Sequence, residues 1–300
     1  MLVKPELPIN LIVFTTLRRY VYLFVGSALV AWLTITVFGW TWLALSATPI
    51  TMVGIALSVF LGIRTYAAYG RYWEGRTLWG KVATVSRHFA HQSVAYLGAD
   101  VARGLIHDQS LYVHALRCHS RSQQILDDPH VQRIAPDQRR LTLKRESNIP
   151  AALVARHHGF LADATRNGDL SDEQLRSFDT SLRDMLDVQG GCERIVNTPL
   201  PASAVFFARW ITIIFGVVLP FCLAATMGFG VLIIAPLVAF AFLIIDVTGE
   251  TMENPFSSDP YGLPLTSISL TIERNIRDRV GENETPPNPP PGGPMGNVQY

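Results

Sequence analysis

The side chains that most often bind metals or attack substrates form no recognisable site in this sequence. Two close histidine pairs lack a nearby carboxylate or thiol at metal-ligand spacing; they are His88 with His91 and His157 with His158. The three cysteines have the spacing of neither a disulfide framework nor a zinc site. HExxH, nucleophile-elbow, P-loop and GxGxxG motifs are absent. We therefore expect no metal, no cofactor and no enzymatic activity.

A different kind of chemistry is indicated by three aliphatic residues that recur at every fourth position: Ile55, Val59 and Ile63. On a helix that rises about 1.5 Å per residue, they form a stripe about 12 Å long on one side. A ring of such helices would enclose a narrow passage, and hydrophobic constrictions gate ion flow by dewetting. Apolar residues on membrane helices more often face lipid or a neighbouring helix, so both interpretations remain open from the stripe alone.

A second stripe, of small residues, runs beside the first and consists of Gly54, Ser58 and Gly62. Small residues at i, i+4 and i+8 let membrane helices approach closely. We predict that this stripe packs against another helix.

Charged residues begin directly after the aliphatic stripe, at Arg64. A charge that faces lipid at this depth costs about 2.5–3.5 kcal/mol. Arg64 therefore faces water or a partner, or it extends to the membrane surface. An ion-pair network between helices is favoured over a transport role for the neighbouring charges. Its candidates are Arg71, Glu74 and Arg76 on one side and Asp246, Glu250 and Glu253 on the other.

The elements that carry these residues are long and apolar. The runs 21–63 and 210–245 contain no Asp, Glu, Lys, Arg or His. Each is about long enough for two crossings of a ~30 Å hydrocarbon layer. We therefore predict an all-α fold with four transmembrane helices in two hairpins. Their expected ranges are Val21–Leu45, a second helix from about Pro49 capped by Thr48, Ala204–Met227 and Gly230–Thr248.

The intervening segment is predicted to be a helical, cytosolic domain. One helix is expected over Ala151–Arg166, with Asn167-Gly168 as its stop signal. Ser171 and Gln174 form a capping box for a second helix, expected to end near Gln189 before two glycines. No stretch shows the period-two alternation of strands.

Charge sets the expected topology. Basic residues flank the hairpins on one side and the short turns carry none, which puts both termini in the cytoplasm of a cell (inner) membrane protein. The net charge of +1 gives no reason to expect a nucleic-acid partner. The expected parts are an N-terminal segment (1–20), helices 1 and 2 (21–72), the cytosolic domain (73–203), helices 3 and 4 (204–249), a C-terminal segment (250–280) and a disordered Pro-rich tail (281–300).

Several motifs occur in the order found in bacterial bestrophins, and the chain resembles that family from about Arg18 to Arg277. They are Gly54–Arg64, Tyr69–Arg76, Leu78-Trp79-Gly80, Gly191–Ile195, Thr198–Pro201, Glu253–Phe256 and Leu263–Leu265. The resemblance implies a homopentamer in the membrane around one pore, passing small monovalent ions, with chloride as the family expectation. It also implies that Ile55, Val59 and Ile63 form the neck of that pore.

Two departures from the family pattern bear on regulation and selectivity. Eukaryotic bestrophins bind calcium in an acidic run after Asn-Pro-Phe, whereas the region from Asn254 to Asp259 carries one carboxylate after that motif, so calcium is not expected. The family's second constriction corresponds to Glu173 or Gln174, within one position. A ring of Glu173 carboxylates would favour cations. A cation-permeable channel and a non-conducting membrane scaffold therefore stand as alternatives.

Overall fold

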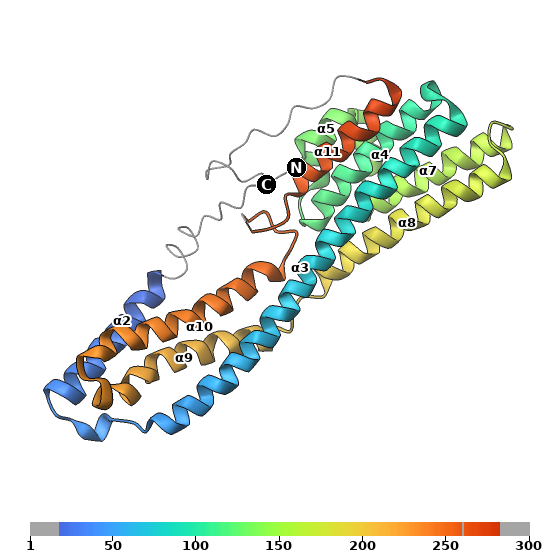
Figure 1. Ribbon diagram of the computed structural model, residues 1–300. Coiled ribbons are helices and arrows are strands. Elements are labelled where there is room, and N and C mark those ends of the chain that lie inside the picture. Colours follow the sequence, from blue (N-terminus) through green and yellow to red (C-terminus); the bar gives the residue numbers. More distant parts are fainter. Residues whose placement is uncertain (1–17, 260, 283–300) are drawn as a thin grey trace. The chain divides into compact units, whose positions relative to one another are not determined.

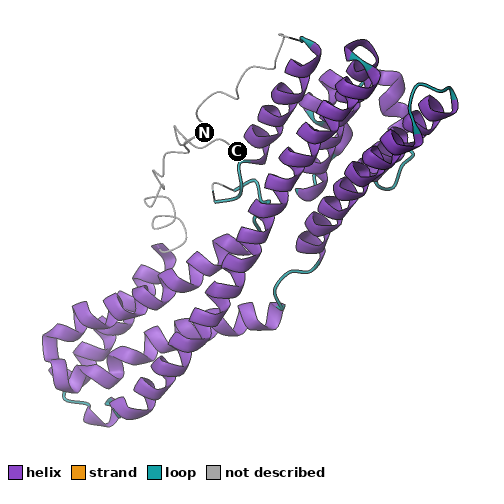
Figure 2. Cartoon of the chain, turned by 45° about the vertical axis from the view of Figure 1, so that its right-hand side comes forward, coloured by secondary structure: helices purple, strands orange, loops and turns teal. Residues whose placement is uncertain are grey.

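The computed structural model describes residues 18–259 and 261–282, and every regular element within them is helical (Figures 1 and 2). The all-α prediction is therefore confirmed for this part of the chain. The predicted disordered tail lies outside the described residues, apart from its first two. The longer helices are α2 (Arg18–Ala31), α3 (Ala47–Leu97), α4 (Ala99–Ser120), α7 (Ile149–Arg166), α8 (Asp172–Asn197), α9 (Ala202–Met227), α10 (Val231–Glu253) and α11 (Leu265–Arg277).

The helices fold into two compact units. Unit 1 contains the described residues 18–72 and 199–254, and unit 2 contains residues 73–198, 255–259 and 261–282. In unit 1, α2, α9 and α10 pack on one another together with the first part of α3. The core of unit 1 contains buried apolar residues from all four helices; they include Phe24, Leu57, Leu61, Phe215 and Leu243.

Three continuous helical stretches in the described residues are long and apolar enough to cross a membrane, judged by length and composition. They are Arg18–Val37, Thr41–Leu97 and Ala202–Glu253. The last stretch contains two helices, α9 and α10, joined by the short 3-10 helix η5 (Gly228–Gly230). Pro220 and Pro236 lie inside these helices as the sequence indicates.

The first predicted helix is too long. After α2 the chain continues as the π-helix η2 (Trp32–Val37) and then leaves the helical path at Gly39, whose φ is +71°. The predicted end at Leu45 is therefore wrong, because a positive φ breaks a right-handed helix and glycine adopts it without steric cost. A short 3-10 helix, η3 (Thr41–Leu43), follows.

The next helix, α3, begins at Ala47 and runs unbroken for 51 residues. The prediction that Thr48 caps this helix is wrong, because Ser46, the residue before the helix, is the cap. The Ser46 hydroxyl accepts a hydrogen bond from the backbone N–H of Thr48 at 3.4 Å. Placing the cap two residues earlier leaves Pro49 in the first turn, where its missing N–H costs no intrahelical bond.

Unit 2 consists of the second part of α3 with α4, α7, α8, α11 and shorter helices. The short helices are η4 (Ile125–Asp127), α5 (Pro129–Ile134), α6 (Asp137–Leu143) and η6 (Asp278–Val280). The predicted helix ending at Arg166 is confirmed, with Asn148 as its N-cap. The capping box of α8 is also confirmed, because Ser171 and Gln174 exchange both hydrogen bonds, at 2.9 and 3.2 Å.

The predicted end of α8 near Gln189 is wrong, since the helix continues to Asn197. Gly190 and Gly191 lie inside it. A Cβ on Gly191 would come within 2.7 Å of Leu78 Cδ2 on α3. The glycine at this position therefore serves close packing of two helices, and tertiary contacts offset its low helix propensity.

Candidate functional site

The three aliphatic residues of the stripe all point away from the folded core of unit 1. Ile55, Val59 and Ile63 are 62%, 58% and 65% exposed. On the other side of the same helix, Leu57 and Leu61 are buried in the core. We call Ile55, Val59 and Ile63 the ladder. As an exposed apolar surface on one helix, the ladder is available to face lipid, another subunit or a pore.

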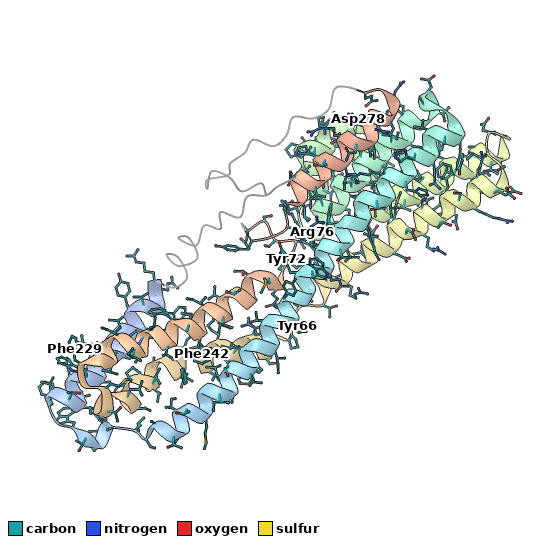
Figure 3. All side chains as sticks on the ribbon, viewed as in Figure 1. Tyr66, Tyr72, Arg76, Phe229, Phe242 and Asp278 are labelled. Carbon is teal, nitrogen blue, oxygen red and sulfur yellow. The ribbon has the colours of Figure 1, made fainter. Side chains whose placement is uncertain are left out.

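The stripe of small residues has a divided environment. Gly54 lies against α9, where a Cβ would come within 3.1 Å of Phe215 Cε2. The Phe215 ring in turn packs edge-on against Phe242 of α10, with centroids 5.0 Å apart (Figure 3 labels Phe242). Ser58 and Gly62 are exposed, and apart from the adjoining backbone of α3 no atom of residues 18–259 and 261–282 lies within 4 Å of a Cβ placed on Gly62. Close packing inside the chain therefore uses Gly54.

A cluster of buried charges begins at the residue after the ladder. Arg64 is 6% exposed and pairs with Asp246 of α10, which is completely buried. The second carboxylate oxygen of Asp246 accepts a hydrogen bond from Nε of Arg209 on α9. The alternative in which Arg64 binds a partner is thus confirmed, and the partner is a carboxylate held between two arginines.

The predicted acidic face of α10 does bind arginines, but the partners differ from those proposed. Arg209, which the sequence analysis did not identify, also donates from Nη2 to Glu250 Oε2 at 2.6 Å. Arg71 donates from Nε to the backbone carbonyl of Glu253 at 3.0 Å. Glu74 pairs with Arg194 in unit 2, so its predicted role is wrong. In the sequence, Arg209 is the last charged residue before the charge-free run that starts at Trp210. That position could have indicated a cation close to the acidic residues at the other end of the run.

The two candidates for the second constriction lie in the first turn of α8 and differ in their availability. Gln174 is engaged in the capping box, where its Oε1 accepts from the backbone N–H of Ser171. Glu173 is exposed, and no hydrogen bond or ion pair of its side chain occurs within the described residues. Of the pair, Glu173 is the side chain free to meet solvent or ions.

The segment that corresponds to the calcium-binding region of eukaryotic bestrophins forms a tight turn after Asn254. The backbone carbonyl of Asp259 accepts from the N–H of Gly262 at 2.9 Å, and that of Pro255 from Leu263 at 2.7 Å. A Cβ on Gly262 would lie 2.2 Å from the Ser257 carbonyl oxygen, which excludes other residues there. The segment from Asn254 to Gly262 carries one carboxylate, that of Asp259.

Comparisons with known proteins agree with one another. The model of the family described as bacterial/fungal bestrophin proteins matches residues 10–278. A voltage-dependent anion channel-forming protein of Ralstonia nicotianae is 35% identical over 257 residues, covering 84% of this chain and 81% of that protein. The voltage-dependent anion channel-forming protein YneE of Escherichia coli K12 is 32% identical over 242 residues, covering 79% and 78%.

Solved structures show the same relationship. A bacterial bestrophin homologue from Klebsiella pneumoniae is 26% identical, with a TM-score of 0.85, and the match covers 89% of this chain and 99% of that chain. The family match spans most of the sequence, and the relatives are matched over most of their length. This chain belongs to the family of bacterial and fungal bestrophins.

Proposed function

We propose that this protein is an ion channel in which the ladder lines the narrow part of a pore at the centre of a homopentamer. The observation that carries the proposal is the exposure of all three ladder residues on a helix whose opposite side is buried. Narrow passages lined by aliphatic side chains lose water readily, and dewetting then blocks ions. The printed names of the relatives as channel-forming proteins support the same function.

The proposed topology has four crossings, by α2, α3, α9 and α10, with both termini and unit 2 in the cytoplasm. It is supported by the apolar length of these helices and by the distribution of basic residues around them. The corresponding location is the cell (inner or plasma) membrane. The other partners in this proposal are further copies of the chain, membrane lipid and monovalent ions.

Anions are the proposed permeant ions, because the curated relatives above are named as anion channel-forming proteins. One observation favours a cation-permeable version instead. The exposed Glu173 carboxylate would form a ring of five negative charges if it surrounded the pore exit, and such rings favour cations. The scaffold alternative requires that the purified protein carries no current.

The ladder is tested by replacing Ile55, Val59 and Ile63 with alanine, one at a time and together, in protein reconstituted into planar bilayers. A wider and more readily hydrated neck should raise the current severalfold. Val53→Ala is the matched control for Val59→Ala, because Val53 is also exposed on α3 but lies about 120° away from Val59 around the helix. Equal effects of these two substitutions would contradict a pore-lining ladder, and absence of current from the pure wild-type protein would favour the scaffold.

Selectivity is tested by the reversal potential under asymmetric NaCl. An anion channel and a cation channel give opposite signs. Glu173→Gln removes the proposed carboxylate ring while keeping the size of the side chain. In the cation-permeable version it should shift the reversal potential toward that of chloride, and an unchanged value would exclude Glu173 from the permeation path.

A further inference from the structure

The cluster of Arg64, Asp246 and Arg209 lies at the end of the ladder and connects three helices of unit 1. Arg64 directly follows Ile63, the last ladder residue, and consecutive side chains on a helix point about 100° apart. Ile63 is exposed while Arg64 is buried. At this height along α3, Ile63 therefore lies on the side away from the core of unit 1 and Arg64 on the side that faces the core. The rotation of α3 that exposes Ile63 is therefore the one that brings Arg64 to Asp246.

Asp246 is the centre of the cluster. Its two carboxylate oxygens bind different arginines, Arg64 through Oδ1 and Arg209 through Oδ2. Asp246 has no exposed surface, and the side chain of Arg209 is 21% exposed. A fully buried carboxylate that binds two cations is costly to leave without them, because a buried charge must be paired or hydrogen-bonded. The contact consequently favours one rotational position of α3 relative to α9 and α10.

The same seam between α3 and α10 contains further close contacts. A Cβ on Gly249 would come within 3.2 Å of Thr65 Oγ1, and that hydroxyl lies 3.5 Å from the backbone carbonyl of Ile245. Apolar residues buried on this side of α3 are Leu57 and Leu61, earlier in the helix, and Ala68, about one turn after Arg64. At the level of the last ladder residue, polar contacts thus determine how α3 meets α10.

Arg64 is not fully satisfied in this arrangement. Its Nε and Nη2 are buried with no hydrogen-bond partner in the part of the chain that the structure describes, and Nη2 lies 3.9 Å from a carboxylate oxygen of Glu253. The Glu253 carboxylate is therefore a second acceptor near the guanidinium group, and a small movement of α3 would bring Arg64 within hydrogen-bond distance of it. The pair with Asp246 holds Arg64 in one of two available positions.

We propose that Asp246 is a positioning residue for the neck: by binding Arg64 it sets the rotation of α3 and therefore the direction in which the ladder points. This inference rests on the proposed pore function of the ladder. Ions have no contact with Asp246 in this scheme. Weakening the pair lets α3 rotate or shift along its axis. The open probability of the channel then changes, while the residues that line the neck stay the same.

The experiment compares open probability in single-channel recordings of the reconstituted full-length protein. Asp246→Asn keeps the shape of the side chain and removes its charge, and open probability should change by at least about fivefold, the lower end of typical coupling between sites. Asp246→Glu retains the charge and should restore most of the wild-type value. Glu74→Gln, which breaks the exposed pair with Arg194 in unit 2, is the control and should have no effect.

Positioning and simple stabilisation are separated by combining Asp246→Asn with Val59→Ala. Asp246 forms its ion pairs with Arg64 and Arg209 and not with a ladder residue. If Asp246 sets the direction of the ladder, the effects of the two substitutions on open probability are nevertheless non-additive. Additive effects, or an open probability unchanged in Asp246→Asn, would overturn the proposal. If Asp246→Asn does not assemble, Arg64→Lys carries the test, since it keeps the charge and loses the two-sided geometry of the guanidinium group.

The failure of this proposal is distinguishable from that of the proposed function. A wild-type channel that responds to Val59→Ala but not to Asp246→Asn or Arg64→Lys retains its ladder and rejects the positioning role. A protein that carries no current, or does not respond to ladder substitutions, rejects the pore itself.

Discussion

At the scale of single residues, unit 2 contains a histidine that is buried without polar partners. His157 is completely buried, both of its ring nitrogens lack a hydrogen-bond partner among the described residues, and its ring centroid lies 4.7 Å from that of Phe89. Burial lowers its pKa from the usual 6.5 to about 4, with nearby Arg139 contributing. Above about pH 4 the folded chain therefore holds His157 in its neutral form.

This histidine makes stability depend on pH in a predictable direction. The unfolded chain takes up the proton below pH 6.5 and the folded chain does so only near pH 4, so stability falls as the pH drops through this window. Between pH 7.5 and pH 5 the loss is about 2 kcal/mol. His157→Phe should reduce that loss, measured as the thermal unfolding midpoint in detergent. His158→Phe, at a neighbouring side chain that is 45% exposed, is the control for the substitution itself, and equal behaviour of the two variants would refute this account.

A second residue-scale prediction concerns Glu273 of α11, which is fully buried. Burial by itself raises the pKa of a carboxyl group, but hydrogen bonds from His114 and Arg133 lower that of Glu273 to about 2. Arg277 adds a second guanidinium group, with its Nε 3.1 Å from Glu273 Oε1. Glu273→Gln leaves these cations without their carboxylate and should cost about 3–5 kcal/mol of stability. Asp163→Asn, in an exposed pair with Arg166, should change stability by less than about 1 kcal/mol in the same unfolding assay.

At the scale of elements, one glycine brings three helices of unit 1 together. A Cβ on Gly216 of α9 would lie 2.4 Å from Phe24 Cε1 on α2 and 2.9 Å from Ala239 Cβ on α10. Both neighbours are fully buried and have little room to move. The absence of a side chain at Gly216 is therefore what allows α2, α9 and α10 to approach so closely.

Gly216→Ala should accordingly destabilise the packing of these helices by about 1–3 kcal/mol, as overpacking does in well-packed cores. The measurement is the thermal unfolding midpoint and the yield of assembled protein. Gly26→Ala is the control in α2, because no described atom outside the adjoining helix backbone lies within 4 Å of a Cβ at that position, and alanine improves helix propensity there. A Gly216→Ala protein as stable as the Gly26→Ala protein would contradict the packing argument.

At the scale of the whole molecule, the exposed ladder has its proposed role only when several chains surround one axis. Native mass spectrometry of the protein in detergent should give five chains per particle. With Cys118, Cys192 and Cys222 replaced by alanine, Val59→Cys should form disulfide-linked dimers under mild oxidation, because the proposed pore makes ladder residues of different subunits face each other across the axis. Val53→Cys should not, and a monomeric particle or equal cross-linking of both variants would be inconsistent with the proposed pore.

The extent to which the sequence predicted the site varies with the range of the interaction. Ile55, Val59 and Ile63 were recognised from local spacing, and the structure places all three on one exposed side of α3. The acidic residues of α10 were also recognised as partners of arginines. Arg209 was missed and Glu74 was assigned to the wrong partner, because ion pairing between distant segments depends on how helices pack, which spacing along one helix does not encode.

By itself, the sequence determined the all-helical character, the long apolar segments, the helix caps at Ser171 and Gln174, and membership of the bestrophin family. The first three follow from periodicity, composition and capping, which act over a few residues, whereas the family follows from motifs in the order found in its members. Only the tertiary structure decided that α8 continues through Gly191, that Gly216 joins three helices and that Asp246 binds both Arg64 and Arg209. The reason is physical: close approach of helices and the burial of charge are properties of surfaces that meet only after folding.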